Sequence, residues 1–83
     1  MSPNLEDRLY EARLRRSLPD PAVRKMLRAR FGIAQQAIAD EIGCSREEIS
    51  RFESGARNPS RRLLLPYVRV LNRLQEELSR IDA

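Results

Sequence analysis

The chain has 83 residues, a formal charge of +4 at neutral pH, one cysteine and no histidine. This length predicts one small domain, and without histidine the usual metal clusters and the Ser-His or Cys-His nucleophilic pairs cannot be built. We therefore expect neither an enzyme nor a metal, cofactor or small-molecule site, and the lack of a membrane-spanning run or a signal peptide predicts a cytoplasmic protein without membrane contact.

The excess positive charge lies in the middle of the chain. Residues 21–63 carry nine basic and five acidic side chains, whereas basic and acidic residues balance in 1–20 and in 64–83. A basic segment favours polyanions, because its cations contact phosphates and release counterions. A merely soluble surface is the alternative interpretation, which a net charge of +4 does not exclude.

The N-terminal part of the chain predicts two helices. Residues 3–17 carry leucines at helical spacing, which indicates a helix that the following prolines interrupt. Asp20 is a suitable N-cap for the next helix, and Pro21 is a suitable first residue. This second helix extends to about Arg30, and Gly32 ends it.

The next segment has the pattern of a helix-turn-helix. Two short helices are expected at about 35–42 and 45–53, joined by a tight turn at Gly43. Ala39 falls where the two backbones would come closest. The apolar positions that would share one small core between the helices are Ile38, Ile42, Ile49 and Phe52. This layout carries the second helix into the major groove of DNA.

The second motif helix begins with a capping box. The Ser45 hydroxyl can accept from the backbone N–H of Glu48, whose carboxylate can reach back to the Ser45 amide, so Glu48 is assigned a structural role. Ile49 and Phe52 point inward. The opposite arc of the helix is polar and would face a groove; it consists of Arg46, Glu47, Ser50, Arg51 and Ser54.

The C-terminal segment is helical in pattern but contains Pro66, which removes a helical hydrogen bond and clashes with the preceding turn. We expect either a short turn at 60–65 followed by a helix at 66–80, or one bent helix. Apolar residues alternate spacings of three and four, as in a heptad seam: Leu64, Tyr67, Leu71, Leu74, Leu78 and Ile81. This seam either packs on the protein's own helices or joins two copies as a homodimer.

Together these residues resemble the Cro/CI (XRE) family of helix-turn-helix DNA-binding proteins over roughly 22–71. The set that carries the resemblance is Gln35, Ala39, Gly43, Ile49, Glu53, Gly55 and Pro59 at these spacings. The resemblance implies an all-α fold with a five-helix, lambda-repressor-like DNA-binding core. In this single domain of residues 1–83, we expect an extra helix at 3–17, the core at 21–65 with the motif at 35–53, and a long C-terminal helix at 66–81.

The resemblance also implies roles for individual residues. Those at positions that read base edges are Arg46, Glu47, Ser50 and Arg51, in keeping with the preference of arginine for guanine and of glutamate for cytosine. Those expected to bind phosphates are Gln35, Gln36, Ser54, Arg57, Asn58, Ser60 and Arg61. For Arg46 and Arg51 the alternative is contact with phosphate only, and for Glu47 it is no contact with DNA.

Three further positions have structural interpretations. In the family, the residue at Glu53 pairs with an arginine of the first core helix, which here is Arg28. Cys44 falls at a normally apolar position, so we interpret it as a small core residue rather than a reactive thiol. Ala34 stands where the family prefers serine or threonine, and a missing N-cap typically costs ~1 kcal/mol.

These features predict a protein that binds double-stranded DNA sequence-specifically and regulates transcription, as a repressor in a bacterial cytoplasm or a phage-infected host. Two alternatives stay open. One is an antitoxin-type protein that binds DNA and also a partner protein through its extensions. The other is a protein–protein adaptor that uses the motif only as a scaffold, although a scaffold needs no basic arc.

Overall fold

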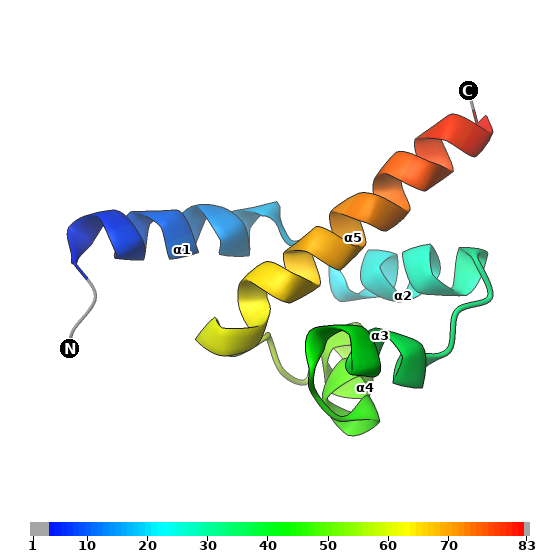
Figure 1. The fold of residues 1–83 in the computed structure, drawn as a ribbon, viewed down its shortest axis with the longest axis horizontal. Helices are drawn as coiled ribbons and strands as arrows, with labels where there is room; N and C mark the ends of the chain where they lie inside the picture. The colour runs from blue at the N-terminus through cyan, green and yellow to red at the C-terminus, as the bar shows by residue number, and fades with distance from the viewer. Residues whose placement is uncertain (1–3, 83) are drawn as a thin grey trace.

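The computed structural model describes residues 4–82, which form five α-helices and no strand, so the expected all-α class is confirmed. The helices are α1 (Leu5–Ser17), α2 (Pro21–Arg30), α3 (Gln35–Ile42), α4 (Arg46–Ser54) and α5 (Arg61–Asp82). Figure 1 shows α5 crossing over the group formed by α2, α3 and α4, with α1 extending away from that group. None of the helices in the described part is both long and apolar enough to cross a membrane.

The number of helices differs from the expectation. An extra N-terminal helix was expected on a core of five, whereas the described residues hold five helices in all. Of the two alternatives for the C-terminal segment, the structure has the single helix, which begins at Arg61 and continues through Pro66. The proline ring removes one hydrogen bond, but Leu64 before it and Tyr67 after it are each 1% exposed, and this packing holds the helix together.

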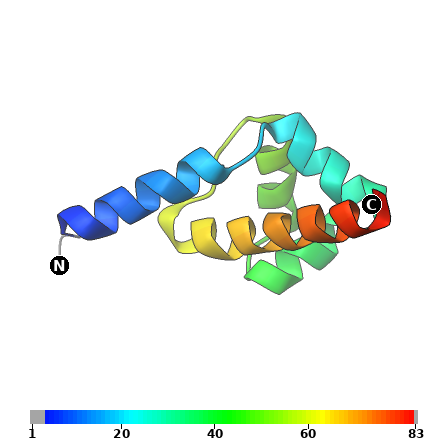
Figure 2. The same cartoon turned by 90° about the horizontal axis from the view of Figure 1, so that it is seen from above.

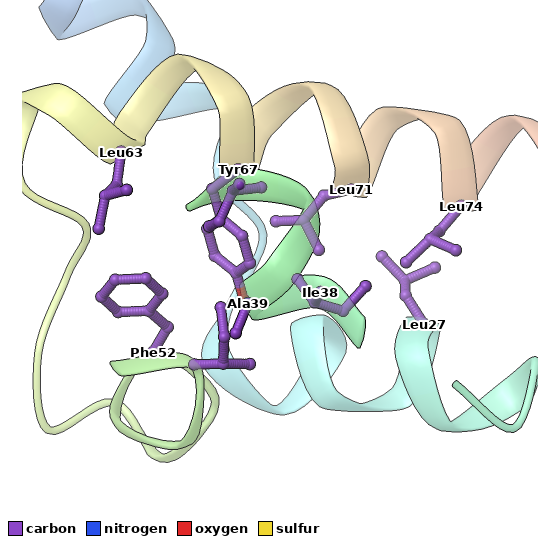
Figure 3. Packing of buried hydrophobic residues seen from close by; sticks show 10 residues of the cluster. Leu27, Ile38, Ala39, Phe52, Leu63, Tyr67, Leu71 and Leu74 are labelled. Atoms are coloured by element: carbon purple, nitrogen blue, oxygen red, sulfur yellow. The ribbon is translucent and has the colours of Figure 1, made fainter. Parts of the chain in front are cut away.

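The core lies where α5 covers the other three core helices. Its buried apolar side chains are Leu27 from α2, Ile38, Ala39 and Ile42 from α3, Ile49 and Phe52 from α4, and Leu63, Tyr67, Leu71 and Leu74 from α5. Figure 3 shows Phe52 facing Tyr67 and Leu63 at one end, and Leu27 facing Leu74 at the other. The rings of Phe52 and Tyr67 are 5.1 Å apart between centroids, within the range of favourable aromatic pairs.

Most of the heptad seam packs inside this chain. Leu64, Tyr67, Leu71 and Leu74 are buried and Leu78 is half-buried, whereas Ile81 is 64% exposed. The first of the two alternatives for the seam, packing against the protein's own helices, therefore describes all but the end of α5.

The N-terminal helix α1 is the least buried of the five, and none of its residues is fully buried. It begins at Leu5 because Asn4 caps it, accepting a hydrogen bond from the Asp7 N–H at 2.8 Å. The leucine side chains at its start point to solvent, with Leu5 69% and Leu9 44% exposed. Its second half packs beside the start of α5, and both views show its first half projecting beyond the other helices (Figures 1 and 2).

Candidate nucleic-acid interface

The connection between α3 and α4 is set by local signals in the sequence. Gly43 ends α3 with φ of +81°, a left-handed conformation that favours glycine, and its N–H donates to the Ala39 carbonyl at 2.8 Å. The predicted capping box then starts α4. The Glu48 N–H donates to Ser45 Oγ at 3.2 Å, and the Ser45 N–H donates to Glu48 Oε1 at 3.4 Å. Ala34, in contrast, provides no side-chain cap for α3.

Helix α4 has two contrasting faces. Ile49, Phe52 and Glu53 are 0%, 1% and 7% exposed, because this face lies against α2 and α3, and Phe52 also packs on Tyr67 of α5. The residues predicted to read bases all lie on the exposed side: Arg46, Glu47, Ser50 and Arg51. Arg46 Nη2 and Glu47 Oε1 lie 3.5 Å apart, with half or more of each side chain exposed. Such an exposed pair is weak, so both side chains are available to a ligand.

The predicted pair of Arg28 and Glu53 is present and holds α4 to α2. Arg28 donates from Nε to Glu53 Oε2 at 2.6 Å and from Nη2 to Oε1 at 2.9 Å, a bidentate arrangement. Arg28 Nη1 also donates to the Ile33 carbonyl at 2.6 Å. The hydrogen bond with Glu53 raises the pKa of the Arg28 guanidinium, so Arg28 stays charged throughout the ordinary pH range.

Gln35 joins the same network. Its side-chain amide donates to Glu53 Oε1 at 3.1 Å, so in this structure it links the start of α3 to α4. The neighbouring Gln36 donates to Asp40 Oδ1 at 2.8 Å, one turn further along α3. Both residues predicted to bind phosphate from α3 therefore have partners within the chain.

The remaining residues predicted to bind phosphate follow α4 along the chain. Ser54 Oγ donates to the Arg51 carbonyl at 3.2 Å and accepts from the Ala56 N–H at 3.3 Å, which closes the last turn of α4. At the start of α5, Arg61 Nε lies 3.1 Å from Glu11 Oε1 of α1. Arg57, Asn58 and Ser60 are exposed in the loop between them. These residues therefore follow one another along the chain from the last turn of α4 to the first turn of α5.

Arg24 was not predicted from the sequence, yet it is one of two almost fully buried charged residues in the part of the chain whose burial the structure describes. Its guanidinium donates to the carbonyls of Pro19 and Phe52 and to Asn58 Oδ1, at 2.8, 3.1 and 3.4 Å. The one available signal was its spacing, four residues before Arg28 on the same side of α2. Arg62 was missed as well, and its Nη1 donates to the Gly43 carbonyl at 3.4 Å.

Cys44 lies in the turn before α4. It is half-buried against the core cluster, as the interpretation of a small core residue predicts. Burial raises the pKa of its thiol, and the nearby Glu48 acts in the same direction. A thiol with a raised pKa is less often the reactive thiolate.

The fold and these contacts can be set against known proteins. A family model described as "Helix-turn-helix domain" matches residues 12–81, which is most of the chain. The chain belongs to the helix-turn-helix domain family. This membership confirms the identification from sequence of a helix-turn-helix DNA-binding protein. The matched region also includes the second half of α1.

Curated relatives of this helix-turn-helix protein include two from Archaeoglobus fulgidus, each named "Uncharacterized HTH-type transcriptional regulator". The first is 40% identical over 55 residues, covering 66% of this chain and 79% of the relative. The second is 36% identical over 58 residues, covering 70% of this chain and 82% of the relative. No solved structure gives a significant match.

Proposed function

We propose that this protein is a transcriptional regulator of the Cro/CI type that binds double-stranded DNA sequence-specifically and acts as a repressor. The observation that carries the proposal is the division of α4 into a fixed inner face and an exposed polar outer face. The two relatives named as transcriptional regulators support the same role. Repression follows if the bound domain covers DNA that the transcription machinery needs.

In this proposal α4 lies in the major groove. Arg46 and Arg51 donate to guanine, and Glu47 accepts from cytosine N4, while Ser50 lets the helix approach closely. The exposure of all four side chains supports this assignment. The Arg46–Glu47 pair is solvent-exposed, so exchanging it for contacts with bases costs little.

Phosphate contacts come from both ends of the motif. Arg57, Asn58, Ser60 and Arg61 hold the backbone at the end of α4, and Gln35, Gln36 and Ser54 add polar contacts beside them. Helix α5 begins at Arg61, so the first backbone N–H groups of this helix add donors at this end. In the case of Gln35, one N–H of the amide is used by Glu53 and the second serves the phosphate.

A homodimer, if it uses α5, forms at the end of that helix. The rest of the apolar seam is already buried within the chain, while Ile81 is 64% exposed.

The adaptor alternative is disfavoured by the exposed arginines of α4, which a scaffold does not need. If the protein is of the antitoxin type, the exposed start of α1, where Leu5 is 69% exposed, is a surface that its partner protein could bind.

A gel shift with random duplex DNA at two salt concentrations tests the proposal. We expect binding at low salt that weakens steeply as salt rises. Replacing Arg57 by alanine should lower the slope of log affinity against log salt by about 1, because one phosphate contact is lost. Arg80→Ala removes another exposed arginine, near the far end of α5, and should leave the slope unchanged. Absence of binding by the wild type at low salt contradicts the proposal.

A further inference from the structure

Arg24 has an unusual environment for a charged residue. It is 5% exposed, and its partners are three neutral oxygen atoms, the carbonyls of Pro19 and Phe52 and the side chain of Asn58. Burying a guanidinium is costly unless its N–H groups are bonded, and the network here meets that requirement. The guanidinium is therefore fixed in position by these hydrogen bonds, and its partners show which segments of the chain it joins.

The three partners come from three separate parts of the fold. Pro19 lies between α1 and α2, Phe52 lies in the last turn of α4, and Asn58 lies in the loop between α4 and α5. The final carbonyls of a helix lack partners inside it and form the negative end of its dipole. Arg24 satisfies one of these carbonyls with a cation, which favours its position at the end of α4.

The loop of residues 55–60 is held by further contacts on the same side. Gly55 has φ of +82°, and a Cβ at this position would lie 3.3 Å from Cγ of Pro21, so the loop lies directly against the start of α2. Arg15 Nη1 of α1 donates to the Pro59 carbonyl at 3.0 Å. The loop is thus placed by α1 and α2, although it belongs to neither.

We propose that Arg24 is a positioning residue for DNA binding: it fixes the loop of residues 55–60 so that Arg57 and Arg61 meet phosphates together with α4. This inference rests on the proposed function. Arg24 is itself too buried to touch DNA. Any effect of its substitution on phosphate contact must therefore be indirect, passing through the loop or through the end of α4 that it also bonds.

The test measures the salt dependence of DNA binding for Arg24→Lys. Lysine keeps the charge, but its single ammonium group cannot span the three acceptors that the planar guanidinium reaches. We expect about tenfold weaker binding to random duplex and a salt slope lower by about 1 to 2, because Arg57 and Arg61 lose their phosphates. Arg24→Gln should lower the affinity and the salt slope at least as much. Arg80→Gln removes one positive charge elsewhere on the chain and controls for the charge that Arg24→Gln removes.

A purely structural role gives a different result. Leu74→Ala removes a side chain at the other end of the core from Leu63 and Phe52 (Figure 3), and serves as a control matched for lost stability. Measured where all variants are folded by circular dichroism, this control should keep the wild-type slope. A wild-type slope in both Arg24 variants overturns the inference while leaving the proposed function intact. Failure of the wild type to bind DNA contradicts the proposed function instead.

Discussion

The two faces of α4 differ in what holds their side chains. On the inner face, Ile49, Phe52 and Glu53 are almost fully buried, and Glu53 accepts hydrogen bonds from two other helices. On the outer face, Ser50 and Arg51 are exposed, and Arg46 has only an exposed pair. Substitutions on the inner face should therefore change stability, and those on the outer face should change DNA binding without changing stability.

The largest effect is expected on the inner face at Phe52. Phe52→Ala should lower the free energy of unfolding by about 3–5 kcal/mol, because a ring that is 1% exposed and packed on Tyr67 is lost. Urea denaturation followed by circular dichroism measures this change. The adjacent outer-face variant Arg51→Ala should stay within about 0.5 kcal/mol of the wild type. A loss of stability at Arg51 as large as that at Phe52 would remove the distinction between the faces.

Next in size is the ion pair behind α4. Glu53→Ala should cost about 3 kcal/mol, because Arg28 is left as a mostly buried cation without its partner. Arg28→Ala combined with Glu53→Ala should cost clearly less than the sum of the two single changes, as expected for residues in direct contact. Additive losses in this double-mutant cycle would show that the pair contributes nothing as a pair.

A smaller effect should appear at alkaline pH. Burial, with Glu53 nearby, raises the pKa of Tyr67 above its ordinary value of 10.0. The fold favours the neutral phenol, so this contribution is complete below pH 10 and is lost as the pH rises further, by about 1 kcal/mol per pH unit. In urea titrations at pH 9, 10 and 11, Tyr67→Phe should show a flatter dependence than the wild type. Cys44 also has a raised pKa, but both proteins retain it, so its contribution cancels in the comparison. If the free energy of unfolding fell equally with pH in both proteins, this role for Tyr67 would be contradicted.

Much of the motif could be predicted from the sequence, because local signals define it. Pro21, Gly43 and Ser45 mark helix ends by their own backbone preferences, and the predicted bounds of α2 and α3 agree with the structure. The exposed face of α4 followed from helical periodicity in the same way. The pairing of Arg28 with Glu53 came from the family resemblance, and the structure contains it.

Other features could not be predicted, because they depend on residues distant in sequence. Whether α5 continues through Pro66 depends on how Leu63 and Tyr67 pack against other helices. The roles of Arg24 depend on Phe52 and Asn58, which are 28 and 34 residues away. Periodicity within α2 indicates the direction of its side chains but not which carbonyls of another helix they will meet.

The most direct test of the two-faced α4 compares two duplexes. A sequence selected from a random pool by the wild-type protein and a scrambled version of it would each be titrated with wild type and with Arg51→Ala. If the outer face reads bases, the substitution should weaken binding to the selected duplex by about 5- to 150-fold more than binding to the scrambled one. An equal loss on both duplexes would contradict base reading by Arg51 and leave it as a phosphate contact.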